Sequence, residues 1–232
     1  MANPTVGFEL RQPIRFDDAP QPIGLIPGWL RELREMRGRV WYDGGRRPFF
    51  RKSDGAFDDA DPADLYAYHI IVREGGRPVG CSRLVPLLPG RPSFVVQYLG
   101  EDTFARILRR YSARRQRTCE ASRWVVVPEH RNGLGAHIVA ATWAIAQRLG
   151  YELAFVLACT SQHQDRALVR LGARVVEGLG TFRVDHFVED GRLLSFDALH
   201  PPGFMQERMA RVRRDFALDA LVPAFQDYSE VA

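Results

Sequence analysis

The fold is decided by residues 119–150, CEASRWVVVPEHRNGLGAHIVAATWAIAQRLG, which contain a strand, a glycine turn and a helix in immediate succession. The apolar run from Trp124 to Val127 is typical of a buried strand, and Pro128 ends it. Gly133 and Gly135 allow tight backbone conformations where a helix can begin. Apolar residues then recur at helical spacing, namely Leu134, Ile138, Ala141, Ile145 and Leu149. The stretch therefore predicts a strand and an apolar-faced helix joined by a tight turn.

The start of this helix is suited to hold an anion. Its first-turn amides have no partner within the helix, and the helix dipole is positive there. His130 and Arg131 add positive charge. The turn lacks the Lys-Ser or Lys-Thr of a nucleoside triphosphate loop and the later acidic residue of a dinucleotide fold. We therefore interpret it as the site of another phosphate-bearing ligand, while an ordinary turn into a helix remains the alternative.

The rest of the chain alternates between strand and helix patterns. We expect helices at residues 29–40, 103–115, 165–171 and 203–225, and strands at 65–73, 77–86, 152–159, 174–177, 182–188 and 193–199. Glu74-Gly75-Gly76 is a hairpin signal between the first two of these strands. Residues 43–64, rich in glycine, proline and charge, predict a long functional loop. This order indicates an α/β (α+β) fold, a mixed sheet with helices on both faces.

Composition favours one domain. At 232 residues with 46% hydrophobic residues, the chain can bury one sizeable core, so we expect a single domain over 1–232 with an irregular segment at 1–24 and a helical tail at 203–232. We identify no apolar run near the roughly 20 residues of a membrane span and no export signal. Cys81, Cys119 and Cys159 are odd in number and widely spaced, which favours buried thiols in a reducing compartment. We therefore expect a cytoplasmic protein.

The net charge of +4 rests on arginine, since Lys52 is the single lysine among 32 basic residues. Arginines cluster in 106–117 and again in 208–214. A solvated helix face and an electropositive landing site for an acidic partner are both open interpretations. Nucleic acid is the least favoured partner, because no binding motif or interleaved aromatic residue accompanies the charge. The histidines show no ligand spacing with cysteine or acidic residues, so we expect no metal.

The turn His130-Arg131-Asn132-Gly133-Leu134-Gly135-Ala136 resembles the Arg/Gln-x-x-Gly-x-Gly/Ala loop of the GNAT acyltransferase superfamily, with His130 in place of the usual Arg or Gln. In that superfamily the loop holds the phosphates of a pantetheine carrier. The resemblance implies a mostly antiparallel sheet in which two central parallel strands splay and admit the pantetheine arm. The donor-binding residues it implies are Trp124, Val125, Val126 and Val127 together with His130, Arg131, Asn132, Gly133, Leu134, Gly135 and Ala136.

Further segments resemble the acyl-homoserine-lactone synthases, a GNAT-related family of quorum-sensing enzymes. Glu120-Ala121-Ser122-Arg123-Trp124 is similar to their Glu-x-Ser-Arg-Phe signature, and residues 80–86, GCSRLVP, to their Gly-Cys-x-Arg-Leu-Leu-Pro. Residues 33–37 with Trp41 resemble their N-terminal Leu-Arg-x-x-x-Phe region, and Phe57-Asp58-Asp59 their acidic loop. The order agrees from about Arg34 to Gly180. The substrate-binding residues implied are Arg37, Trp41, Asp58, Arg83, Ser122 and Arg123.

Three departures separate the chain from those synthases or from common acetyltransferases. The synthases generally lack the glycine pair of residues 133 and 135. Their tryptophan before the acidic loop is missing here, where Arg47-Pro48-Phe49-Phe50 stands. Leu168 occupies the region in which a common acetyltransferase often has a tyrosine as general acid. The resemblance therefore leaves the acceptor open.

Acyl transfer to an amine has chemical demands that these residues can meet. The amine must be neutral, and Glu120 is the candidate to take its proton, directly or through a water. The leaving thiol has a pKa of about 8.5, so a missing tyrosine is tolerable. A backbone N–H near Trp124 to Val126 is the candidate oxyanion donor. Arg83 would be costly to bury unpaired, so we expect it to meet Asp58, Asp59, Glu120 or an acceptor carboxylate.

Strand geometry bears on the roles of these side chains. In a regular strand Glu120 and Ser122 share one face and Arg123 points to the other, so we expect Glu120 and Arg123 to lie apart. Structural alternatives remain for both: Glu120 as the partner of a neighbouring arginine, and Arg123 as an anchor for the acidic loop at Asp58 and Asp59.

We therefore predict an N-acyltransferase that uses a thioester of coenzyme A or phosphopantetheine and the amine of a small amino-acid-like acceptor. The resemblance implies S-adenosylmethionine as acceptor, an acyl-homoserine lactone as product and acyl carrier protein as a candidate partner. The alternatives are an acetyl-coenzyme A N-acetyltransferase, an N-acyl amino acid synthase and, in another class, a non-catalytic GNAT-like binding module.

Overall fold

The computed structural model describes residues 6–14, 26–45, 47–131 and 133–216. Its strands are β1 (Val6–Arg11), β2 (Tyr68–Glu74), β3 (Arg77–Pro86), β4 (Thr118–Val126), β5 (Leu153–Cys159), β6 (Arg174–Val175), β7 (Phe182–Val184) and β8 (Glu189–Asp197). Its α-helices are α1 (Gly28–Gly45), α2 (Phe94–Leu99), α3 (Glu101–Arg110), α4 (Leu134–Arg148), α5 (Gln164–Arg170) and α6 (Gly203–Phe216). Short 3₁₀ turns are η1 (Pro48–Phe50), η2 (Pro62–Tyr66), η3 (Arg115–Arg117), η4 (Pro128–His130) and η5 (Asp185–Phe187).

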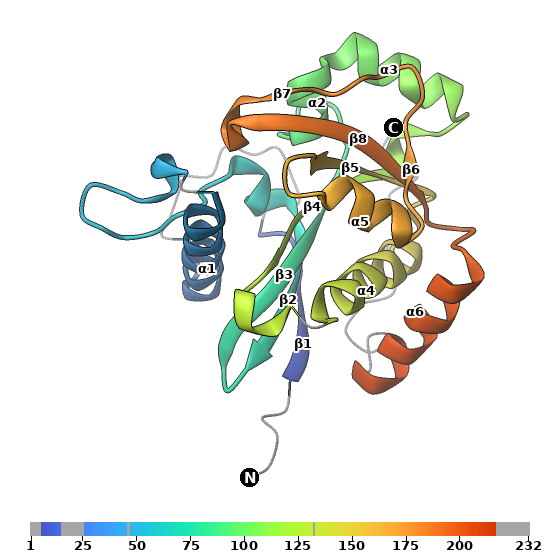
Figure 1. Ribbon diagram of the computed structural model, residues 1–232. Coiled ribbons are helices and arrows are strands. Elements are labelled where there is room, and N and C mark those ends of the chain that lie inside the picture. The colour runs from blue at the N-terminus through green and yellow to red at the C-terminus, as the bar shows by residue number, and fades with distance from the viewer. Residues whose placement is uncertain (1–5, 15–25, 46, 132, 217–232) are drawn as a thin grey trace.

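The strands form one mixed sheet in the order β1-β2-β3-β4-β5-β8-β6, with β7 also paired to β8 (Figure 1). All neighbouring pairs are antiparallel except β4 and β5. Their ladder is short, joining Thr118–Glu120 to Leu153–Phe155. Beyond Glu120, β4 runs on to Val126 with no strand partner on its β5 side among the described residues. The predicted mixed, mostly antiparallel sheet with a splayed parallel pair is confirmed.

Helices cover both faces of the sheet, as predicted (Figure 1). Along β5 the side chains alternate: Ala154, Val156 and Ala158 join the core formed with α4 and α6, while Leu153 and Phe155 join the core formed with α2 and α3. A third core lies under α1 and includes Leu33, Ile71 and Val125. One face of the sheet is covered by α4 and the other by α1 to α3. The opening between β4 and β5 therefore joins two faces of the sheet that have different surroundings.

The helix predicted after the glycine turn is present as α4. Its middle, residues 138–146, is buried on all sides because it lies between the sheet and α6. Even so, no helix in the described part of the chain combines the length and the apolar character that crossing a membrane requires.

The structure corrects several expected boundaries. Part of the segment expected to be irregular forms the edge strand β1, which pairs with β2. Its residues Phe8 and Leu10 pack against the core formed with α4 and α6. The expected strand at 65–73 begins only at Tyr68, because η2 occupies Pro62–Tyr66 after the Asp61 N-cap. A further helix, α2, starts at the Ser93 N-cap, whose hydroxyl accepts from the Val96 amide.

Later boundaries also differ. The strand expected at 182–188 stops at Val184 and continues as η5, and the last strand of the sheet begins earlier than expected, at Glu189. The final helix runs from Gly203 to Phe216, and the predicted remainder to residue 225 lies outside the described residues.

One glycine predicts how tightly the loop after α1 is held. A Cβ on Gly38 would lie 2.7 Å from the Asp58 backbone nitrogen, whereas a Cβ on Gly44, in the same helix, would meet nothing within 4 Å. We expect Gly38→Ala to lower the free energy of unfolding by about 1–3 kcal/mol, since backbone must move. Gly44→Ala should leave it unchanged or raise it by up to about 1 kcal/mol. Urea denaturation measures both, and equal stability of the two variants would show that the loop yields freely.

Candidate active site

Gly133 and Gly135 are glycines for different reasons. Gly133 precedes α4 with φ at +92°, in the left-handed region that favours glycine. Gly135 lies inside α4, where a Cβ would come within 3.0 Å of the Trp124 indole. The Trp124 Nε1–H donates to the Gly135 carbonyl oxygen at 3.1 Å. Only Gly133 has the turn role that the sequence predicts for both, and Gly135 makes room for Trp124.

The two basic residues of the turn have different surroundings. His130 Nε2 lies 3.0 Å from a carboxylate oxygen of Glu74, at the β2–β3 hairpin. Arg131 is exposed and lines an open groove of about 820 Å³. Asn132 lies outside the described residues. Arg131 is therefore the cation of the turn that faces this groove.

The groove runs between α1, β4, the glycine turn and α5. Its lining comprises Val40, Trp41, Gly44, Trp124, Val125, Val126, Arg131, Gly135, Gln162, Gln164 and Ala167. It thus follows the part of β4 that has separated from β5, with the start of α4 at its side. This placement suits an elongated, phosphate-bearing ligand.

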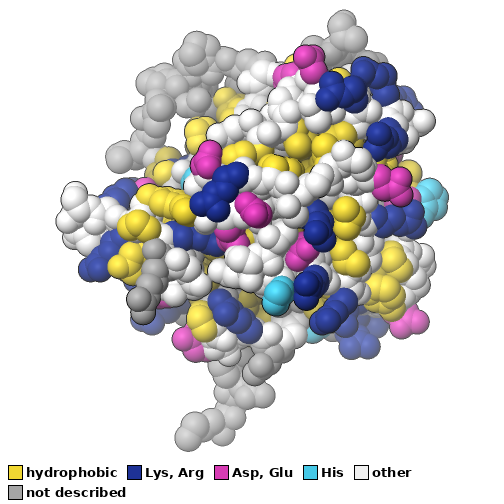
Figure 2. Space-filling model, turned by 45° about the horizontal axis from the view of Figure 1, so that its top comes forward, with side chains coloured by type: hydrophobic (Ala, Val, Ile, Leu, Met, Phe, Trp, Pro, Cys, Tyr) yellow, Lys and Arg dark blue, Asp and Glu magenta, His cyan; other side chains and the backbone are white. Residues whose placement is uncertain are grey.

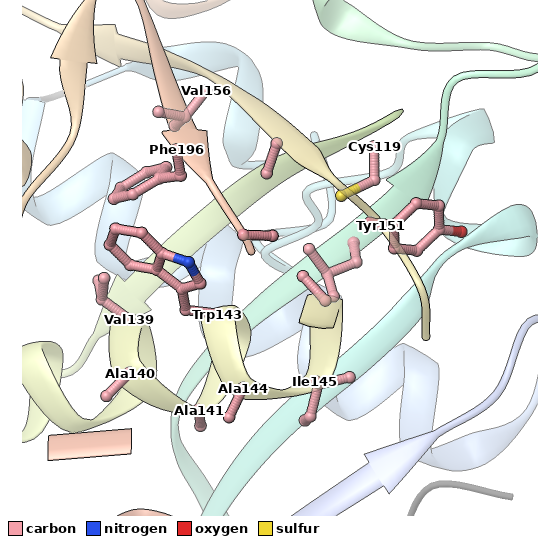
Figure 3. Packing of buried hydrophobic residues seen from close by; sticks show 14 of the residues in the cluster. Cys119, Val139, Ala140, Ala141, Trp143, Ala144, Ile145, Tyr151, Val156 and Phe196 are labelled. Atoms are coloured by element: carbon pink, nitrogen blue, oxygen red, sulfur yellow. The ribbon is translucent and has the colours of Figure 1, made fainter. Parts of the chain in front are cut away.

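An apolar pocket of about 470 Å³, a volume that includes space open to solvent, lies on the α4 side of the same opening. Its walls include Trp143 and Phe196, whose rings meet edge to face with centroids 4.7 Å apart (Figure 3). The hydroxyls of Ser82 and Thr142 lie 2.5 Å from each other, and Thr142 also donates to the Ile138 carbonyl, so both polar groups are satisfied. The remaining lining is almost wholly apolar, which suits a hydrocarbon chain.

A central cavity of about 510 Å³, a volume that includes space open to solvent, shares lining residues with both the groove and the apolar pocket. Its lining combines apolar and ionisable side chains, namely Trp41, Phe94, Glu120, Ser122, Arg123, Trp124, Val156, Leu157, Ala158, Cys159, Gln164, Leu168 and Phe187. Leu168, which stands where a tyrosine is common in acetyltransferases, lines this cavity and the apolar pocket. The central cavity is where an acceptor could meet a thioester.

A buried network of ion pairs adjoins the central cavity through Arg123, which lines it. Arg37 pairs with Asp64 at 2.7 Å and with Asp59 at 2.9 Å. Arg83 pairs with Asp64 at 2.7 Å and with Asp61 at 2.5 Å. Arg123 completes the network, with Asp59 and Asp61 each at 2.8 Å. These contacts fasten the loop before β2 to α1, β3 and β4.

The charges of the network hold one another in the ionised state. Burial alone would raise the pKa of Asp61, yet Arg83 and Arg123 lower it to about 2. Burial also opposes ionisation of Asp64, whose pKa is nevertheless well below its usual range because of Arg37 and Arg83. The pKa of His69 falls to about 4, mainly through burial, and its Nε2 lies 2.8 Å from the Asp64 carbonyl oxygen. His69 is therefore neutral in the folded protein at neutral pH.

Glu120 stands at the edge of this network, and only one of its two carboxylate oxygens accepts hydrogen bonds from the described residues. Its Oε2 accepts from the Ser93 hydroxyl at 2.8 Å and from the Val95 amide at 3.0 Å, which secures the start of α2. Its Oε1 is buried, accepts no hydrogen bond from the described residues, and lies 3.7 Å from Arg83 Nη2. Buried carboxylate oxygens generally accept a hydrogen bond, and the N–H of an incoming amine would be a suitable donor to this oxygen.

Glu120 and Arg123 share the central cavity, contrary to the strand alternation expected from sequence. The β3–β4 pairing shifts register between Cys81↔Val125 and Arg83↔Ser122, so β4 carries an extra residue there. Arg123 has φ of +56°, in the left-handed region. This β-bulge returns the Arg123 side chain to the face of Glu120.

The remaining predicted residues divide between this cavity and its surroundings. Arg37 and Arg83 are fully buried in the ion network, Ser122 accepts from Arg83 Nε at 2.9 Å, and Trp41 lines the cavity. Asp58 instead pairs with Lys52 at 2.6 Å at the loop surface. The carboxylates expected for Arg83 were Asp58, Asp59 or Glu120, and its closest partners are Asp61 and Asp64.

Arg47 fills the region where the resemblance leads one to expect a tryptophan. Its guanidinium pairs with Glu189 and lies over the rings of Trp41 and Phe187, at 4.9 and 5.1 Å from their centroids. Arg123 lies 5.5 Å from the Phe187 centroid. No sequence motif pointed to Phe187 or Glu189, because both follow residues 34–180 and reach the site only through the β7–β8 connection.

The cysteines do not present a reactive thiol. Burial raises the pKa of Cys81 to about 12 and that of Cys159 to about 11, and it raises the pKa of Cys119 further still. All three are buried and unpaired by disulfides, as small core residues are.

The basic helix α3 lies away from the glycine turn. η3, just after α3, leads into the first residue of β4, whereas the turn follows the last, and a nine-residue strand spans roughly 30 Å. No described residue of α3 lines the groove or either cavity. Arg109, Arg110 and Arg114 therefore do not border the groove or either cavity. Figure 2 shows basic side chains on this face interspersed with acidic ones.

Comparison with known proteins agrees with this geometry. A family model for the acetyltransferase (GNAT) domain matches residues 39–141, which include β2 to β4 and the glycine turn. No curated protein sequence matches the chain.

Solved structures share the fold over most of their length. The CoA-dependent acyl-homoserine lactone synthase BjaI, in a structure with SAM and isopentyl-CoA, has a TM-score of 0.61 at 15% identity, over 95% of this chain and 93% of that chain. The CoA-dependent synthase MesI has a TM-score of 0.54 at 20% identity, over 87% and 92%. An acyl-CoA N-acyltransferase from Pseudomonas aeruginosa has a TM-score of 0.53 at 15% identity, over 82% and 99%. The fold is that of GNAT proteins, and together with the domain match it supports an acyltransferase.

The buried His69 predicts acid sensitivity in a defined window. Its folded pKa of about 4 lies below its unfolded value of 6.5, so the unfolded chain binds more protons between these values and stability falls as pH drops from 6.5 to 4. The full effect corresponds to roughly 3 kcal/mol. We expect His69→Gln to lose less stability than wild type between pH 7 and pH 4.5 in urea denaturation. An equal loss of stability in both proteins would show that groups other than His69 cause the acid sensitivity. Asp61 does not interfere with the test, because its pKa of about 2 lies below this pH window.

Proposed function

We propose that this protein is an N-acyltransferase that moves an acyl group from a pantetheine thioester to the amine of a small amino-acid-like acceptor. The observation that carries the proposal is the Oε1 of Glu120, which accepts no hydrogen bond from the described residues, at the central cavity where the groove and the apolar pocket converge. A base at that point would act on an acceptor amine beside the thioester carbon.

The donor would lie in the groove with its phosphates at the glycine turn. There the amides of the first turn of α4 and the Arg131 guanidinium face an anion, and the separated edge of β4 offers unpaired backbone groups to the pantetheine arm. The acyl chain would continue into the apolar pocket beneath α4, whose lining excludes water from it.

The reaction forms a C–N bond and breaks a C–S bond. Glu120 removes a proton from the acceptor ammonium so that the neutral amine attacks the thioester carbonyl. A backbone N–H of β4 beyond Glu120 stabilises the oxyanion. The tetrahedral intermediate collapses with departure of the thiolate, which takes up the second proton lost by the nitrogen. Because the conjugate acid of the thiolate has a pKa of about 8.5, no acid is needed at the position of Leu168.

The acceptor is an amino-acid-like amine, and S-adenosylmethionine is our first candidate. The central cavity offers aromatic rings for an apolar or aromatic portion and Arg123 near its wall for a carboxylate. BjaI was determined with SAM, and TofI, another protein of the same fold, with MTA. The product would then be an acyl-homoserine lactone, formed when the carboxylate of the acylated acceptor attacks its own γ-carbon and displaces methylthioadenosine. The presence of Arg47 beside Trp41 keeps an N-acyl amino acid synthase as the second candidate, because it changes the wall next to the acceptor.

Coenzyme A is the donor carrier that the geometry favours. The groove contains its own cation at Arg131, and the arginines of α3 that an acidic acyl carrier protein would contact lie at the other end of β4.

Activity and the role of Glu120 are tested together. Wild-type protein with acyl-coenzyme A and a panel of amines should release free thiol, detected with a chromogenic disulfide. We expect Glu120→Gln to lower turnover by about 10² or more, because the amide cannot take the proton. Ser93→Ala, which removes a donor to Glu120 and the cap of α2 but keeps the carboxylate, should lower the melting temperature while retaining turnover. Thiol release by neither wild type nor variant, with coenzyme A still bound, would identify a binding module.

A pair of charge reversals tests the donor site. Arg131→Glu should raise the KM for acyl-coenzyme A about tenfold, since it places a carboxylate beside the phosphates. Reversal of Arg109 and Arg114, both exposed on or after α3, should leave this KM unchanged. A larger effect of the α3 pair than of Arg131→Glu would place the donor at the opposite end of β4.

A further inference from the structure

Trp124 borders all three spaces of the site. It lines the groove, the central cavity and the apolar pocket, and no other described residue lines all three. Its side chain packs against the core under α4 and against a second cluster that contains Val79 and Ile138. The indole is therefore a wall shared by the places proposed for the pantetheine arm, the acceptor and the acyl chain.

The indole is fixed by its contact with Gly135. Its Nε1–H donates to the Gly135 carbonyl at 3.1 Å, and its Cζ2, Cε2 and Nε1 atoms lie 3.0–3.4 Å from where a Cβ on Gly135 would stand. An added methyl group there would press on the ring and force it to shift. The size of residue 135 and the size of residue 124 therefore constrain each other.

Gly135 also belongs to the turn that starts α4. Any displacement of the ring by residue 135 would change the shape of the apolar pocket, and any displacement of the first turn would move the ring. Packed side chains transmit such shifts because the interior has little free volume.

We propose that Trp124 and Gly135 form a matched pair that seats the thioester at the junction of the three spaces and thereby sets which acyl groups are transferred. Trp124 is in this view a positioning and specificity-determining residue, and Gly135 is the residue that allows its indole. The inference rests on the proposed acyltransferase function.

A double-mutant cycle tests the pair. Wild type, Trp124→Phe, Gly135→Ala and the double variant are compared by kcat/KM for acetyl-, butanoyl- and octanoyl-coenzyme A, and by Kd for free coenzyme A. Each single variant should change the octanoyl-to-acetyl ratio of kcat/KM by about fivefold or more, since a pocket change of one or two methylene groups has effects of this size. In the double variant, the smaller phenyl ring accommodates the new methyl group, so the ratio should return toward that of wild type, with a coupling of at least about threefold.

Trp143→Phe is the matched control. Trp143 also donates its Nε1–H to a backbone carbonyl, that of Asp197 at 3.0 Å, and it lines the apolar pocket only. Its effect on the acyl ratio should be the same in the wild-type background and in the Gly135→Ala background. Melting temperatures of all variants exclude general loss of structure as the cause.

The outcomes separate the two hypotheses. Independent effects of Trp124→Phe and Gly135→Ala on the acyl ratio, or an unchanged ratio in both, would overturn the matched pair while leaving acyltransferase activity in place. Absence of thiol release in wild type together with absence of coenzyme A binding would instead refute the proposed function.

Discussion

The structure depends on the pairing of buried arginines with the aspartates of the loop before β2. Arg37 comes from α1, Arg83 from β3 and Arg123 from β4, and all three meet carboxylates of Asp59, Asp61 and Asp64. Removing so many charges from water has a large desolvation cost that is repaid only when every member is paired. The network is therefore close to all-or-none: with one partner absent, an uncompensated charge would remain in the interior. This explains why a segment rich in glycine, proline and charge has a defined path, and why α1 approaches the loop as closely as Gly38 allows.

The same network explains an unfavourable backbone conformation in the middle of β4. A non-glycine residue with φ of +56° costs free energy, and Arg123 keeps it because the bulge directs its guanidinium toward Asp59 and Asp61. Ion pairing thus selects the bulge, and the bulge in turn places Arg123 beside Glu120 at the central cavity. β4 pairs with β5 only as far as Glu120. The position where the sheet opens, the position of the carboxylate and the start of the irregular backbone therefore coincide within a few residues.

Local sequence patterns predicted the parts of this site that are local. The strand, the turn and α4 follow from an apolar run, two glycines and helical spacing, and the buried state of Arg83 follows from its apolar neighbours. Sequence could not assign Asp61 and Asp64 as partners, because five carboxylates lie within residues 54–64 and their choice depends on how the loop crosses the sheet. It also could not place Arg123, since strand alternation holds only until a bulge intervenes. Phe187 enters the cavity from a distant hairpin. The most useful signal for the ion network is the number of arginines expected to be buried, because three buried arginines require several buried carboxylates as partners.

The two faces of the sheet differ chemically at the site, and this difference matches the two parts of the proposed substrate pair. On the α4 side the opening leads to an apolar pocket in which the Ser82 and Thr142 hydroxyls bond to each other, and on the α1 side it borders the ion network. A thioester has the same division, with a hydrocarbon chain on one side of its carbonyl and a polar attacking amine approaching from the other. Because β4 and β5 are held together up to Glu120 and part beyond it, the sheet leaves room for a ligand between its two faces beyond that point. The geometry of the sheet, more than any single side chain, therefore determines where the chemistry can take place.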